Sequence, residues 1–150
     1  ELISASIFVF FKPNILVGGR QLKIKCRFSW QVEFVKSLVE NEGYQNNIGP
    51  SIALCDNHGR YVFGCNGFDK LVQIDVENQG DSTVEFLLKV PYLMPGTYFL
   101  TFAFPIGNLM HHVQLKWYDC AIQLQVQKDS KNVFGVIALD YEIKELSKVA

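Results

Sequence analysis

Apolar and polar residues alternate along several stretches of this chain, and the alternation constrains the fold more than any other feature. In 21–28 every second residue is apolar, and the four residues between them are polar or charged. Apolar residues recur at every second position in 72–77, 83–90 and 119–127. Successive side chains of a β-strand point to opposite faces. The pattern therefore predicts strands with one buried and one wet side, which is typical of antiparallel sheets.

Apolar segments between turn signals such as Asp56-Asn-His-Gly59 predict further strands. These strands are expected at 3–11, 51–56, 60–66, 97–104 and 133–141. The chain has 15 valines, 11 isoleucines and 12 phenylalanines but only six alanines. β-branched and aromatic residues favour strands, whereas alanine favours helices. A length of 150 residues is that of one domain, so residues 1–150 are predicted to form a single all-β sandwich.

Two segments depart from the simple alternation. In 31–50, the spacing of Val32, Val35 and Val39 predicts a short helix or an irregular strand, and the polar run 41–47 predicts a mobile loop after it. The final strand is apolar on both sides. Val133, Ile137 and Leu139 alternate with Phe134 and Val136.

A strand that is apolar on both sides needs cover on both sides. A second copy of the chain can supply this cover by exchanging the strand, which is a low-cost route to a homodimer. The alternative is that segment 31–50 or the charged tail 142–148 covers it within one chain.

The four cysteines do not form a metal or disulfide motif. No two of them have the CxxC spacing; they are Cys26, Cys55, Cys65 and Cys120. Trp30 follows Cys26 too closely for the cysteine–tryptophan pattern of extracellular immunoglobulin domains. Four reduced thiols are therefore expected, which favours a cytosolic compartment.

Charge and motifs exclude several function classes. Fourteen basic residues balance 15 acidic ones, so no nucleic-acid partner is expected. No P-loop, GxSxG or HExxH motif occurs. His111 and His112 are adjacent, so on a strand they point to opposite faces and cannot chelate one metal together. We expect no catalytic residue, metal or cofactor.

No apolar run approaches the roughly 20 residues of a membrane span. The sequence begins at Glu1 without a leader, so we expect a piece of a longer protein.

Nine asparagines and nine glutamines, together with many aromatic residues, suit sugar recognition. Aromatic rings cover the apolar faces of a pyranose, and amides bind hydroxyl groups. The same residues also make an ordinary soluble surface. From the residues alone, the chain is a non-catalytic β-sandwich module for binding or assembly.

Four motifs sharpen this reading, because they stand in the order and spacing of a known family. They are VGGRQ at 17–21, IALCDNHGRYVFGCN at 52–66, VPYLMPGTYFL at 90–100, and WYDCAIQLQV at 117–126 followed by VFGVI at 133–137. Over roughly residues 5–142 the chain resembles the C-terminal carbohydrate-binding domain of Wzt, the ATPase subunit of ABC transporters that export O-antigen polysaccharide.

The resemblance implies an immunoglobulin-like sandwich that dimerises by exchanging its last strand. It also implies cytoplasmic recognition of a finished O-antigen polysaccharide. The further partners are an ATPase domain, absent from this stretch, and the membrane subunit that holds the transporter at the inner membrane. One alternative is a structural dimerisation module without glycan binding, and a minor one is an extracellular adhesive domain.

Candidate sugar-binding residues are aromatic, histidine and amide side chains near loop ends: Trp30, Tyr61, Asn66, His111, His112, Trp117 and Tyr118. Trp30 continues the buried series of 22–28, so burial in the core is its expected position. Tyr61 shares a face with Phe63, which makes burial an alternative there too. Trp117 and Tyr118 must point opposite ways. The sequence does not decide which of them is exposed.

A polar row on the predicted strand 119–127 is a further candidate surface. Gln123, Gln125 and Gln127 share its outward face. These amides can bind hydroxyl groups, but a plain solvated face is the favoured interpretation because protein surfaces are mostly polar.

Overall fold

The structure is a computed structural model that describes residues 3–9, 15–70, 73–128, 133, 135–138 and 141–146. Strands dominate its described part. The elements in chain order are β1 (Ile3–Val9), β2 (Ile15–Leu16), β3 (Gln21–Trp30), α1 (Val32–Glu42), β4 (Ser51–Asp56), β5 (Tyr61–Cys65), the 3₁₀ helix η1 (Gly67–Lys70), β6 (Asp81–Lys89), β7 (Tyr92–Leu93), β8 (Gly96–Gly107), β9 (His112–Val126) and β10 (Ile137–Ala138).

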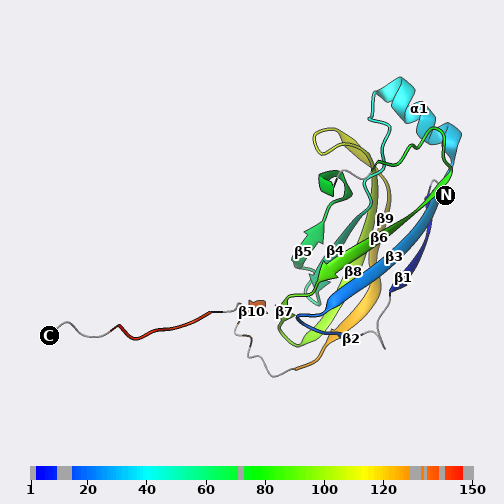
Figure 1. The fold of residues 1–150 in the computed structure, drawn as a ribbon. Coiled ribbons are helices and arrows are strands. Elements are labelled where there is room, and N and C mark those ends of the chain that lie inside the picture. The colour runs from blue at the N-terminus through cyan, green and yellow to red at the C-terminus, as the bar shows by residue number, and fades with distance from the viewer. Residues whose placement is uncertain are drawn as a thin grey trace.

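Two sheets pack face to face, which confirms the predicted β-sandwich (Figure 1). One sheet has the order β1-β3-β6 and the other β2-β9-β8-β4-β5. All pairs are antiparallel except the short pair of β2 with β9, which is parallel. The rings of Phe28 on β3 and Phe104 on β8 lie 4.9 Å apart across the core.

Strand β3 follows its sequence pattern fully, with buried and exposed residues alternating along its length. Its neighbour β6 keeps the same alternation in register, so that Ile24 lies opposite Phe86. On the wet face, Lys23 pairs with Glu85 at 3.7 Å and Arg27 with Asp81 at 3.3 Å. Both ion pairs are exposed, so burial of the other face stabilises this sheet far more than they do.

The prediction of a strand at 72–77 is wrong for its described residues, 73–77, which form no strand. Ile74 and Val76 are nevertheless buried, as the alternation indicates. Asparagine side chains take the place of a neighbouring strand. The side-chain oxygen of Asn47 accepts a hydrogen bond from the Ile74 amide at 2.9 Å, and that of Asn46 accepts one from the Val76 amide at 2.9 Å.

Replacing Asn47 by alanine should lower the free energy of unfolding by about 1–3 kcal/mol, because the buried Ile74 N–H then loses its acceptor. Urea denaturation measures the change. Asn57→Ala, in an exposed turn, is the matched control and should stay within about 0.5 kcal/mol. If the two variants have equal free energies of unfolding, the hydrogen bond between Ile74 and the Asn47 side chain does not stabilise the fold.

Segment 31–50 contains the helix α1, which confirms the helical alternative. Val35 and Leu38 are its buried residues, and Gly43 ends it in the left-handed conformation (φ 73°) that glycine adopts without strain. The polar run 41–47 forms a loop only from Gly43 onward, since α1 extends through Glu42. Its last residues, however, are tied to the sandwich through Asn46 and Asn47.

Strand β9 contains a bulge that the alternation does not reveal. Leu100 pairs with Ile122 but Phe102 pairs with Tyr118, so β9 carries extra residues at this point. Cys120 adopts a positive φ of 48° and is exposed. The prediction that Cys120 shares the buried face of Ile122 is therefore wrong, since the bulge turns it outward.

The last strand is shorter than predicted. β10 spans Ile137–Ala138 and pairs with β7 of the same chain. Phe134 and Leu139 lie outside the described residues. Val136 and Ile137 remain 46% and 40% exposed.

Neither source of cover within the chain reaches the described part of this strand. Segment 31–50 lies at the opposite end of the sandwich, and residues 141–146 extend away from it (Figure 1). This tail exposes three large apolar side chains: Tyr141, Ile143 and Leu146.

Candidate functional site

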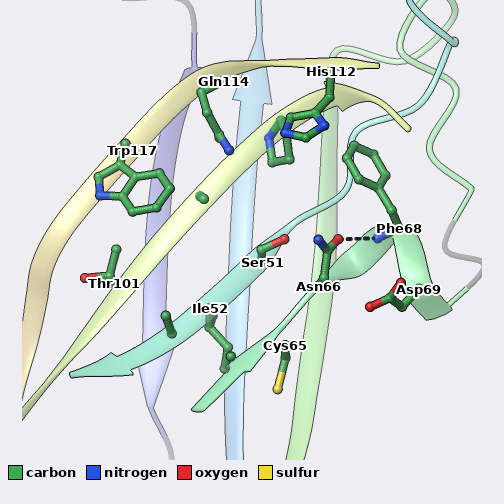
Figure 2. Close-up of a pocket in the computed structure, with 14 residues that line it drawn as sticks. Ser51, Ile52, Cys65, Asn66, Phe68, Asp69, Thr101, His112, Gln114 and Trp117 are labelled. Carbon is green, nitrogen blue, oxygen red and sulfur yellow. Dashed lines mark hydrogen bonds between the residues drawn. The ribbon is translucent and has the colours of Figure 1, made fainter. Parts of the chain in front are cut away.

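A pocket of about 290 Å³ lies on the outer face of the five-stranded sheet, opposite the core (Figure 2). Strands β4, β5, β8 and β9 and the 3₁₀ helix η1 contribute to it. Residues on the inner faces of these strands, such as Leu54, Leu100 and Phe102, fill the core. The residues between them therefore face outward and are free to shape the pocket.

Small side chains make the floor of this pocket. Ala53 lies beside Gly64 on one neighbouring strand and beside Thr101 on the other, and Ser51 lies beside Ala103. Larger side chains at these outward positions would fill the hollow. The pocket therefore results from consecutive small residues on three adjacent strands, and it is part of a rigid sheet.

The rim supplies rings and polar groups: Asn66, Phe68, Asp69, His112, Gln114 and Trp117. The side-chain oxygen of Asn66 accepts a hydrogen bond from the Phe68 amide at 2.9 Å. This bond turns the Asn66 amide nitrogen toward the pocket (Figure 2). Trp117 presents its ring on the opposite side of the hollow. An aromatic face and amide donors thus converge on one space.

The structure separates the adjacent pair that the sequence left open. Trp117 is 47% exposed and lines the pocket. Tyr118 packs against the core, with its ring edge-on to Phe104 at 6.1 Å. Its hydroxyl donates to the Ile3 carbonyl at 3.4 Å. Trp117 is therefore available to a ligand, whereas Tyr118 stabilises the sandwich.

Two other candidates, Trp30 and Tyr61, lie away from the pocket. Trp30 is buried, and its indole N–H donates to the Val76 carbonyl at 3.0 Å, so it belongs to the core. Tyr61 is 63% exposed, because a bulge places it opposite Cys55 and off the face of Phe63. It does not line the pocket.

The histidines divide in the same way. His111 stacks on Tyr44, with ring centroids 4.4 Å apart, and lies outside the pocket, whereas its neighbour His112 lines it. The glutamine row of β9 is exposed, with Gln125 accepting a hydrogen bond from Thr97 at 3.0 Å, and also lies outside. Asn66, His112 and Trp117 are thus the predicted candidates that the fold brings together.

Sequence reasoning missed Phe68, Gln114 and the small floor residues. Phe68 follows a strand in a 3₁₀ turn, and Gln114 precedes the stretch of β9 where alternation is evident. The small residues Ala53, Gly64 and Ala103 offered one usable signal, since these neighbouring outward positions on three strands are all small. Strand order is needed to read that signal.

Within the described ranges, no three histidine, cysteine or acidic side chains lie together as a metal site. Nor does any described helix have the length and apolarity to cross a bilayer.

The four cysteines are free, and they differ in reactivity. Burial raises the pKa of Cys26 to about 12. Desolvation and the neighbouring Asp119 also raise the pKa of Cys120, but its thiol is exposed on the bulge. A thiol reagent at pH 8 should therefore modify Cys120 first, on the order of 100-fold faster than Cys26. Mass spectrometry after brief labelling measures this order, and Cys120→Ser should remove the fast phase.

The unfolded, unreduced chain should show four thiols, and fewer would indicate a disulfide.

Comparisons with known proteins agree on one family. The model of the Wzt C-terminal domain family matches residues 12–139. The crystal structure of the C-terminal domain of Wzt superimposes with a TM-score of 0.72 at 24% sequence identity. That alignment covers 97% of this chain and 83% of the other. No curated protein sequence is significantly similar to this chain. Because the family model spans most of its length, the chain belongs to the Wzt C-terminal domain family.

Proposed function

We propose that this domain binds O-antigen polysaccharide on the cytoplasmic side and confers substrate recognition on an ABC exporter without catalysing a reaction. Family membership supports a role in the O-antigen ABC transporter. The observation that carries glycan binding is the half-exposed Trp117 ring, which faces amide groups across a hollow floored by small residues. A stacking face beside amide donors fits the two surfaces of a pyranose.

The electrostatics of the pocket also favour a neutral ligand. Among the described residues that line it, Asp69, exposed on η1, is the one carboxylate, His112 is the one imidazole, and no lysine or arginine is present. Hydroxyl groups exchange water for protein with a small net gain. Binding is therefore expected in the micromolar to millimolar range, roughly −8 to −4 kcal/mol, with little dependence on salt.

Calorimetric titration of the domain with purified O-polysaccharide from the strain that encodes it tests this function. The proposal expects saturable binding of that polymer and none of a neutral dextran of similar size. An absence of binding at millimolar repeat-unit concentrations would favour the alternative of a dimerisation module.

A homodimer formed through the last strand is part of the proposal. The single chain leaves Val136 and Ile137 exposed. Residues 141–146 extend away from its own sandwich and expose the apolar side chains of Tyr141, Ile143 and Leu146 among charged ones. A second copy would cover these side chains. In the full transporter, residues 1–150 would act as one recognition domain, partnered by the ATPase domain and the membrane subunit at the inner membrane.

A further inference from the structure

A second pocket, of about 440 Å³, lies at the end of the sandwich that carries α1. The loop after α1, the tip of the β8–β9 hairpin and Gln73 form its walls. Its lining combines four amide side chains with three apolar ones: Gln45, Asn47, Gln73, Asn108, Phe68, Leu109 and Met110. None of the described residues that line it is acidic or basic.

This pocket adjoins the first one. Phe68 lines both of them. Its ring centroid is 5.9 Å from that of His112, which lies on the rim of the first pocket. The two pockets therefore share a wall at Phe68, beside His112.

Hydrogen bonds hold three amide groups of the second pocket in place: those of Gln45, Asn47 and Asn108. Asn108 donates to the Gln45 side-chain oxygen at 3.3 Å, which ties the hairpin tip to the loop after α1. The Asn108 oxygen accepts from the Met110 and His111 amides, each at 2.9 Å. Asn47 is fixed by its bond to Ile74. A ligand thus meets amides that are already ordered, which lowers the entropic cost of binding.

The chemistry of the lining selects the ligand class. Without a charged group, the pocket offers no partner for a phosphate or carboxylate, which would lose solvation there. Amides beside the exposed side chains of Leu109 and Met110 suit a ligand with hydroxyl or acetamido groups on an apolar ring. That description fits another neutral sugar.

We propose that one glycan chain occupies both pockets, with consecutive sugars on either side of Phe68. This inference rests on the proposed function, because it extends the same ligand into a second subsite. It predicts that fragments long enough to span both pockets bind more tightly than fragments that fill one.

The test uses the O-polysaccharide of the encoding strain, partially hydrolysed and fractionated from single sugars to several repeat units. Affinities of the native domain are compared with those of the double variant Gln73→Ala/Met110→Ala. Gln73 is exposed and Met110 is 94% exposed, so the fold should tolerate both changes. Gln123→Ala, an exposed change on β9 outside both pockets, is the matched control.

We expect the double variant to bind long fragments about 5- to 20-fold more weakly, the range for one or two lost contacts, and short fragments normally. If the double variant still binds long fragments more tightly than short ones, the remaining difference arises because a longer chain offers more positions at which one pocket can bind. Equal affinities of the native domain and the double variant for long fragments would overturn the second subsite while leaving the proposed function intact. Failure of every fragment to bind would overturn both.

Discussion

Replacing Trp117 by alanine is expected to weaken glycan binding by about 1–3 kcal/mol, roughly 5- to 150-fold, the range for truncating an energetically important contact residue. The free energy of unfolding should change little, because the side chain is 47% exposed on the outer face and leaves no core cavity. Calorimetry of glycan binding and urea denaturation of the same sample measure the two effects.

Tyr118→Ala is the matched control, since it removes the neighbouring aromatic from the opposite side of β9. It should lower the free energy of unfolding by about 2–3 kcal/mol, below the range of about 3–5 kcal/mol for a fully buried aromatic, because Tyr118 is only partly buried against Phe104. Glycan affinity should persist in the fraction that stays folded. Normal binding by a folded Trp117→Ala variant would place the glycan elsewhere.

Deleting the chain from Val133 onward is expected to convert a soluble dimer into a monomer or an insoluble chain. The deletion removes β10 from its pairing with β7 and uncovers an apolar edge. Light scattering coupled to size-exclusion chromatography measures the mass of the soluble fraction.

A chain that ends at Leu146 serves as the control for truncation itself, because it keeps β10 and residues 141–146. Light scattering should give it the mass of a dimer, as expected for residues 1–150. A soluble, well-folded and unchanged dimer after deletion from Val133 would exclude strand exchange as the basis of dimerisation.

The alternation of side chains predicted most of the sandwich, because burial of one face controls each regular strand. It held through β3 and β6, and even Ile74 and Val76 are buried without forming a strand. The alternation gave a wrong prediction at 73–77, where side-chain hydrogen bonds hold the backbone in place of a neighbouring strand. The side chains of Asn46 and Asn47 provide that support, and their sequence context is simply that of a polar loop.

The bulge in β9 limited prediction in the same way. Thr101 donates from its hydroxyl to the Asp119 carboxylate at 3.1 Å and accepts from the Cys120 amide at 3.1 Å. These contacts between β8 and β9 hold extra residues that no local pattern signals. The register past the bulge therefore could not be read from the residues alone.

The sequence predicted which types of residue form the candidate site, but it did not predict where on the sandwich they meet. Asn66, His112 and Trp117 were expected at loop ends and do share the pocket. Trp30 is a core residue, as its place after the buried series of 22–28 predicted, whereas Tyr61 lies off the face of Phe63 because of a bulge. The floor depends on which strands lie side by side, and strand order is a property of the whole sandwich.

The central claim, that glycan binds between Trp117 and Asn66, is tested most directly by mapping NMR chemical-shift changes during titration with the O-polysaccharide. The account predicts saturable shifts of the Trp117 indole N–H and of the side-chain amides of Asn66 and Gln114, with the outer residues of β3 and β6 unchanged. Shifts confined to β3 and β6, or to the last strand and tail, would contradict it.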